Sequence, residues 1–117
     1  MDLEFLTGLV VAFRNARDWQ QFHLPNQLAS AVSIEAAELQ EQFLWKSPEE
    51  VASLSSDASR RVTIGEELAD VLIYSLLLAH ELNLDPAAII QDKLAKNAAK
   101  YPVEKARGSA SKYTELR

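Results

Sequence analysis

The sequence predicts an all-α protein, a four-helix bundle-type subunit whose helices are joined by short loops. Apolar residues recur every three or four positions along most of the chain, which is the spacing of one helix face. Ser47-Pro48 and Asp85-Pro86 each place a capping residue before a proline, which is typical of a helix start. No stretch alternates apolar and polar residues for long enough to predict a strand. The 117 residues are expected to form a single domain, 1–117.

The first helix is predicted from about Asp2 to Trp19, with Asp2 as its cap. Its apolar stripe consists of Leu3, Leu6, Val10, Phe13 and Ala16. The second helix is predicted over about 25–44, because Pro25 suits a first helical turn. The stripe of this helix consists of Leu28, Val32, Glu35, Leu39 and Phe43, so one of its members is an acid.

The later helices have equally clear starts. A capping box from Ser47 to Glu50 predicts one short extra helix near 48–54. A third long helix is predicted over about 58–82, and a fourth begins at 85 and ends at 101, before a proline. The polar tail after it is expected to be irregular. The third helix is apolar nearly all round, which predicts an oligomer in which it is covered on every side.

Composition excludes several classes of protein. The formal charge of −5 argues against a broad basic surface for a nucleic acid polymer. The chain has no cysteine, which excludes disulfides, thiolate metal sites and a cysteine nucleophile, and fits a reducing cytoplasmic location. Its N-terminus lacks the basic region of a signal peptide. The longest apolar run, 71–79, is far shorter than the roughly 20 residues of a membrane span, so no membrane partner is expected.

Two pairs of acids are phased against the apolar stripes. Glu35 and Glu38 are three residues apart on the second helix, and Glu67 and Asp70 repeat this spacing on the third. If the two helices pack antiparallel, the four carboxylates converge. Such a cluster is costly because the acids repel each other and lose water, and a divalent cation with oxygen ligands removes this cost. Spacing prefers Glu67, although Glu66 could take its place.

The absence of histidine ligands beside the acids indicates which metal they would bind. Carboxylate-bridged di-iron bundles use Glu-x-x-His pairs, and neither His23 nor His80 stands three residues after a glutamate. This favours Mg²⁺, with Mn²⁺ as a possible substitute. The competing interpretation is that these acids form ordinary solvated helix faces without metal.

Basic and aromatic residues offer candidate contacts for a nucleotide. Lys93, Asn97 and Tyr101 share one face of the fourth helix, and a lysine and an amide beside a metal suit a polyphosphate. Arg107 and Lys112 in the tail could also meet phosphate. A plain solvated lysine face is the alternative.

Two tryptophans lie near the ends of helices that flank the acidic pairs. Trp19 and Trp45 are suited to stack on a nucleobase. Core packing or a dimer interface is the alternative for both side chains.

The chain resembles the MazG-like, all-α nucleoside triphosphate pyrophosphatases, and most closely their dCTP pyrophosphatase branch. E-x-x-E, 28 residues and E-x-x-D follow in the family's order, and four segments look like its signatures: RDWQQFHLPNQL, EAAELQEQFLWK, EELADVLIY and KYPVEKARGSASKYTEL. The resemblance covers roughly residues 13–117. It implies a helical homotetramer built as a dimer of dimers, and Mg²⁺-dependent hydrolysis of a nucleoside triphosphate to the monophosphate and pyrophosphate, in the housecleaning of the nucleotide pool.

The resemblance also implies roles for particular residues. Four acids would bind the metal, namely Glu35, Glu38, Glu67 and Asp70. Trp19, Trp45 and Tyr74 would line the nucleoside pocket, with His23 as a weaker candidate near the base or sugar. Lys93, Asn97 and Tyr101 would face the phosphates, and the tail would close over the site. For the catalytic step, Glu35 or Glu38 is expected to orient or deprotonate the attacking water.

One position departs from the family pattern. Close relatives of the mammalian enzyme have a histidine nine residues before the tryptophan, where this chain has Val10, which puts the fine base preference in doubt. Two alternatives therefore stay open. One is the same chemistry on dUTP, another modified deoxynucleotide or phosphoribosyl-ATP, and the other is a non-catalytic helical interaction protein.

Overall fold

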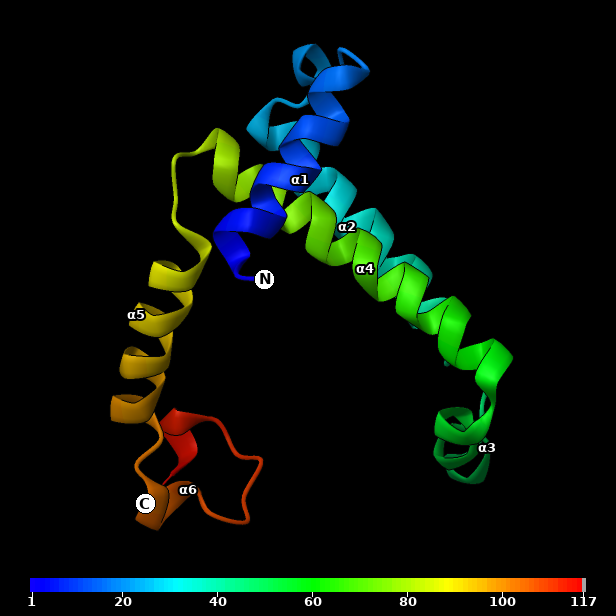
Figure 1. The fold of residues 1–117 in the computed structure, drawn as a ribbon. Helices are drawn as coiled ribbons and strands as arrows, with labels where there is room; N and C mark the ends of the chain where they lie inside the picture. Colours follow the sequence, from blue (N-terminus) through cyan, green and yellow to red (C-terminus); the bar gives the residue numbers. More distant parts are fainter. Residues whose placement is uncertain (117) are drawn as a thin grey trace. The chain divides into compact units, whose positions relative to one another are not determined.

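The computed structural model describes residues 1–116 and confirms the all-α class, since these residues contain no strand. Four helices are long: α1 (Leu3–Ala16), α2 (Pro25–Glu41), α4 (Ala58–Glu81) and α5 (Pro86–Lys100) (Figure 1). Two are short, α3 (Pro48–Ser53) and α6 (Val103–Ala106). Single 3₁₀ turns occupy Gln20–Phe22, Leu54–Ser56 and Tyr113–Glu115. The chain divides into two compact units, Met1–Asn83 and the part from Leu84 onward.

The predicted helix starts are confirmed by their caps. The Asp2 carboxylate accepts a hydrogen bond from the Phe5 amide at 2.8 Å, and that of Asp57 accepts one from Arg60 at 3.1 Å. In the predicted capping box, Ser47 and Glu50 each accept a bond from the other's backbone amide at 3.2 Å. These bonds satisfy amides that the first helical turn leaves without a partner.

Two predicted helix ends and the prediction for the tail are corrected. The first helix ends at Ala16 instead of Trp19, because the chain turns at Asp18, whose φ of 55° is incompatible with a right-handed helix. The second ends at Glu41 instead of 44, and a turn follows in which Trp45 has a φ of 61°. The tail is not wholly irregular, since it contains α6 and the 3₁₀ turn at Tyr113–Glu115.

In the first unit, α2 and α4 run side by side in opposite directions, and α1 packs on α4 (Figure 1). Arg60 at the start of α4 donates a hydrogen bond of 3.1 Å to the Gln42 carbonyl at the end of α2, which fixes this antiparallel pairing. The core is small: Leu28, Leu77 and Ala79 are its buried apolar residues within the described range. The predicted stripe of α2 faces this core from Leu28 to Leu39.

Many apolar side chains of the first unit are exposed. On α1, Leu6 and Phe13 of the predicted stripe face outward, at 37% and 54% exposure. On α4, Leu68 and Leu72 are 45% and 57% exposed. A lone chain would leave this apolar surface in water, as the sequence led us to expect for an oligomer subunit. The oligomer itself stays a prediction.

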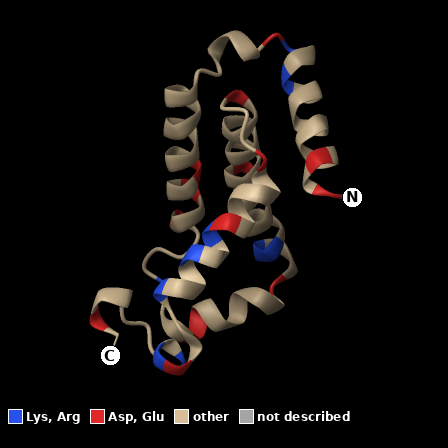
Figure 2. Ribbon diagram, turned by 90° about the vertical axis from the view of Figure 1, so that its left-hand side faces the viewer, with Lys and Arg blue, Asp and Glu red and all other residues tan. Residues whose placement is uncertain are grey.

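The charged residues at the two ends of α1 match its helix dipole. This helix begins at the N label in Figure 2. Glu4 lies in its first turn and Arg14 in its last, an arrangement that complements the dipole (Figure 2). Among the helices of the described residues, none is long and apolar enough to cross a membrane.

In the second unit, the tail folds back on the end of α5. The rings of Tyr101 and Tyr113 meet edge to face, with centroids 6.1 Å apart. The Lys100 ammonium lies 4.9 Å from the Tyr113 ring centroid, a cation–π contact. Gly108 makes the turn between them, with a φ of 74° that favours glycine.

Candidate metal centre

Three carboxylates from α2 and α4 come together in the first unit. Glu35, Glu38 and Glu67 each offer an oxygen, and these oxygens all lie within 4.8 Å of one another. The three-residue spacing places Glu35 and Glu38 on one face of α2, and the antiparallel pairing brings Glu67 of α4 opposite them. The convergence expected from the sequence is therefore present for these three acids.

The environment of Glu35 disfavours its charge. Its side chain is partly buried, and its Oε2 atom is buried without a hydrogen-bond partner among the described residues. Burial raises the pKa of Glu35 above its ordinary value, with further contributions from the neighbouring Glu38 and from the charges of Asp70 and Glu67. A buried carboxylate oxygen without a partner is costly, so this atom is an available ligand.

The fourth predicted ligand lies close to the cluster but outside it. Asp70 is partly buried on α4, one turn after Glu67, and it is not among the three acids whose oxygens converge. Its charge nevertheless acts on the cluster. The pKa of Glu67 is raised by burial first, then by Glu38, Asp70 and Glu66. A ligand role for Asp70 stays a prediction.

These residues fit a hard divalent cation. Such ions take several oxygen ligands, and the three carboxylates supply oxygens at close range without nitrogen or sulfur. A cation would also remove the mutual repulsion that raises the pKa of Glu35 and Glu67. The cluster could therefore bind a metal ion.

The predicted aromatic residues of the first unit take different positions. Trp19 is 44% exposed and meets Phe13 edge to face, at 6.0 Å between ring centroids. Trp45 is 92% exposed in the turn after α2. Tyr74 lies on α4 one turn beyond Asp70, and its ring meets that of His23 at 6.4 Å and 65°. The Nδ1 atom of His23 is buried without a hydrogen-bond partner in the described part of the chain.

The predicted phosphate contacts all belong to the second unit. Lys93 is exposed and Asn97 is partly buried on α5, while Tyr101 ends that helix. Arg107 and Lys112 are exposed in the segment after α6. Their roles toward phosphate stay predictions.

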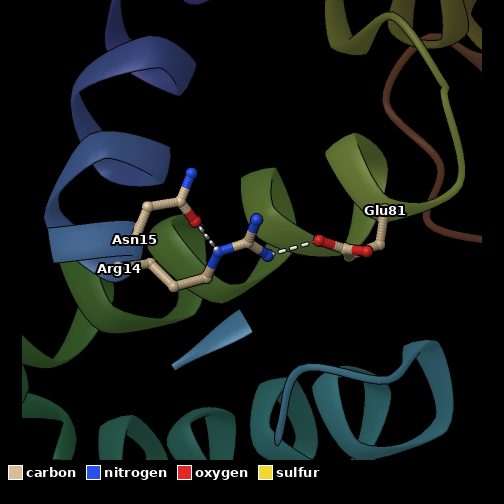
Figure 3. Close-up of polar contacts among 3 residues, drawn as sticks. All are labelled: Arg14, Asn15 and Glu81. Carbon is tan, nitrogen blue, oxygen red and sulfur yellow. Dashed lines mark hydrogen bonds and ion pairs between the residues drawn. The ribbon is translucent and has the colours of Figure 1, made fainter. Parts of the chain in front are cut away.

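Sequence reasoning missed one buried ion pair. Arg14 of α1 is only 4% exposed and pairs with Glu81 of α4 (Figure 3). A signal was available, since Leu3, Thr7, Val10 and Arg14 follow helical spacing and form the inward face of α1. The predicted stripe contained Leu6 and Phe13, which are exposed in the structure. Thr7 and Arg14 lie on the inward face instead.

Comparisons with a family model, with related proteins and with a solved structure agree on one family. The model of the MazG-like family matches residues 30–116. The chain is 41% identical to dCTP pyrophosphatase 1 of Rattus norvegicus, over 97% of this chain and 67% of the rat protein. It is 40% identical to dCTP pyrophosphatase 1 of Homo sapiens, again over 97% of this chain and 67% of the human protein.

A solved structure shares the fold. The crystal structure of a pyrophosphatase from Archaeoglobus fulgidus superposes with a TM-score of 0.74 at 40% sequence identity. The match covers 85% of this chain and 91% of the archaeal chain.

Proposed function

The chain belongs to the MazG-like family, and from that premise we propose that it is a nucleoside triphosphate pyrophosphatase acting on dCTP or a modified dCTP. Water hydrolyses the bond between the α- and β-phosphates, and the products are the monophosphate and pyrophosphate. The convergence of Glu35, Glu38 and Glu67 is the observation that carries this proposal. The similarity to proteins named dCTP pyrophosphatase 1 supports the choice of substrate.

We assign the cation to Glu35, Glu38, Glu67 and Asp70, with Mg²⁺ as the natural ion and Mn²⁺ as a substitute. When bound there, it would neutralise charge on the triphosphate as pyrophosphate leaves. The buried Oε2 atom of Glu35 supports its place in the ligand set, because no other group of the described residues satisfies that atom. The charge of Asp70 reaches the cluster, which supports its inclusion.

We assign the catalytic roles to Glu35 and Glu38 on α2. Glu35 or Glu38 orients the attacking water and accepts its proton. Trp19, Trp45 and Tyr74 contact the nucleoside, with His23 as a weaker candidate near the base or sugar. The aromatic surfaces of Trp19 and Trp45 are exposed enough to stack on a base.

Three further expectations belong to the same proposal. The binding of phosphate by Lys93, Asn97 and Tyr101, and by Arg107 and Lys112 in the tail, is proposed from the family resemblance. A homotetramer built as a dimer of dimers accords with the apolar surface of α1 and α4. A cytoplasmic housecleaning role is proposed from the substrate class.

Pyrophosphate release from a panel of nucleotides tests the proposal. The panel is dCTP, 5-methyl-dCTP, dUTP, dTTP, dATP, dGTP and CTP, each with and without Mg²⁺. We expect metal-dependent release that is fastest with dCTP or 5-methyl-dCTP. Faster release from dUTP or another nucleotide would support the same reaction on a different substrate.

Matched variants separate the site from the rest of the surface. Glu67→Gln is expected to abolish release, whereas Glu49→Gln, at an exposed acid of α3, is expected to leave it unchanged. Folded protein that neither releases pyrophosphate nor binds Mg²⁺ would refute the proposal and favour the interaction-protein alternative.

A further inference from the structure

A buried ion pair ties α1 to the end of α4. Arg14 is the buried charged residue of the described chain, and its guanidinium donates to the Glu81 carboxylate and, through Nε, to Asn15 Oδ1 at 3.1 Å (Figure 3). Figure 3 shows the Arg14 side chain reaching from the end of α1 across to α4. A buried cation is strongly unfavourable without a partner, so this pair specifies where the two helix ends meet.

The same arginine adjoins the turn that carries Trp19. Its backbone carbonyl accepts hydrogen bonds from the amides of Arg17 at 3.1 Å and Trp19 at 3.2 Å. These bonds end α1 and fix the start of the next segment. The position of the Trp19 backbone therefore depends on the Arg14 main chain, and the ion pair acts on it by holding the end of α1 against α4.

The pair also faces His23. Burial lowers the pKa of His23, the Arg14 cation lowers it further, and the Glu81 carboxylate raises it. The imidazole ring meets Tyr74 of α4 edge to face. Arg14 from α1, and Glu81 and Tyr74 from α4, are the titratable or charged groups that these contacts bring to His23.

We propose that Arg14 and Glu81 are positioning residues for the nucleoside end of the site, which hold Trp19, His23 and Tyr74 in one fixed arrangement. The inference rests on the proposed function, because that function gives Trp19 and Tyr74 their contact with the nucleoside. The pair touches no reacting group itself. An apolar pair of similar volume would stabilise the fold equally well or better, but apolar contact is non-directional and would not fix the rings.

The chain offers a direct spectroscopic test, because it has two histidines and the second, His80, is exposed. The imidazole signals are titrated by NMR in ligand-free protein, with His80→Asn used for assignment. We expect the pKa of His23 to rise in Arg14→Met, where only Glu81 remains, and to fall further in Glu81→Gln, where only Arg14 remains. If both variants move it toward its ordinary value, the residues merely hold the fold together and the proposal fails.

Kinetics give the second readout. Arg14→Met and Glu81→Gln are each expected to raise KM for the nucleotide about tenfold while kcat changes less than about twofold, because the carboxylate cluster is untouched. Arg61→Met, at an exposed arginine of α4, is the matched control and should keep the wild-type KM. An unchanged KM in folded Arg14→Met would overturn the proposal.

A double variant covers the case in which a single change prevents folding. Arg14→Met combined with Glu81→Leu removes both charges and keeps apolar volume, so it should fold. We expect its KM to stay raised, and recovery of the wild-type KM would refute a positioning role. Failure of the proposed function can be distinguished from failure of this proposal. If the function is wrong, the wild-type protein releases no pyrophosphate. The histidine titration would then still decide whether the pair controls these rings.

Discussion

At the scale of the residue, Glu35 combines a place on the apolar face of α2 with a carboxylate oxygen that has no partner among the described residues. Its neighbours Glu38 and Glu67 make its ionised form still less favourable. Without a cation, such a cluster lowers the stability of the folded state. Two predictions follow from this conflict between function and stability.

Replacing the most exposed member of the cluster should stabilise the metal-free protein. Glu38→Gln removes a charge that acts on both Glu35 and Glu67, so we expect the melting temperature in chelator to rise by a few degrees. The same change should lower pyrophosphate release by about a hundredfold or more. Thermal denaturation and a release assay measure the two effects, with Glu49→Gln as control. Full turnover in this variant would contradict the assigned role of Glu38.

The raised pKa of Glu35 predicts how stability depends on pH. In metal-free protein its contribution is fully present below the ordinary value of 4.5, and it is lost as pH rises through the higher pKa of the folded state. We therefore expect wild-type protein to gain more in melting temperature than Glu35→Gln when the buffer is changed from about pH 7 to about pH 5.

The comparison with Glu35→Gln is needed because His23 acts in the opposite direction. Its pKa is lowered from 6.5, so its contribution is present above that value and is lost as pH falls through the pKa of the folded state. Both proteins contain His23, and its effect cancels in the difference between them. Equal pH profiles would show that Glu35 does not titrate abnormally.

At the scale of the element, each long helix is specified by signals that the sequence displays openly. The cap Asp57, and the cap Asp85 followed by Pro86, mark the starts of α4 and α5 correctly. Helix ends were less predictable, because Asp18 and Trp45 adopt left-handed backbone conformations that residues other than glycine seldom take. Side-chain identity gave no warning of these two turns.

The cap of α4 should contribute measurably to stability. The Asp57 carboxylate accepts the Arg60 amide at 3.1 Å, so Asp57→Ala is expected to lower the free energy of unfolding by about 1 kcal/mol. Urea denaturation measures this loss. Asp92→Ala, in the exposed interior of α5, is the control and should show no such loss. An equal loss in both variants would mean that the cap bond is not the cause.

At the scale of the whole molecule, the carboxylate cluster could be predicted because each pair of acids is local in sequence and only the antiparallel packing had to be assumed. The pairing of Arg14 with Glu81 could not, since the two residues are 67 positions apart, although the helical spacing of Arg14 was a signal for its burial. The inward face of α1 was misassigned because the predicted stripe followed apolar residues alone and so left out Thr7 and Arg14. Its outward apolar residues would suit contact with another chain.

The exposed apolar surface of α4 predicts that assembly depends on it. Leu72 is 57% exposed, and Leu72→Lys should shift the protein to a smaller species by placing a charge in the proposed interface. Light scattering after size-exclusion chromatography measures the mass. Ser59→Lys, at an exposed polar position of the same helix, should leave the mass unchanged. A wild-type protein that is already monomeric would refute the predicted oligomer.

The left-handed backbone of Trp45 has a consequence for how this position tolerates change. A residue with a side chain at a φ of 61° lowers the stability of the fold by roughly 1 kcal/mol relative to glycine. Because the Trp45 side chain is 92% exposed, its burial contributes little stability to offset this cost. In a library randomised at this codon, enrichment for heat resistance should therefore favour glycine and asparagine, whereas enrichment for turnover should retain tryptophan. Retention of tryptophan under both regimes would mean that the indole serves stability after all.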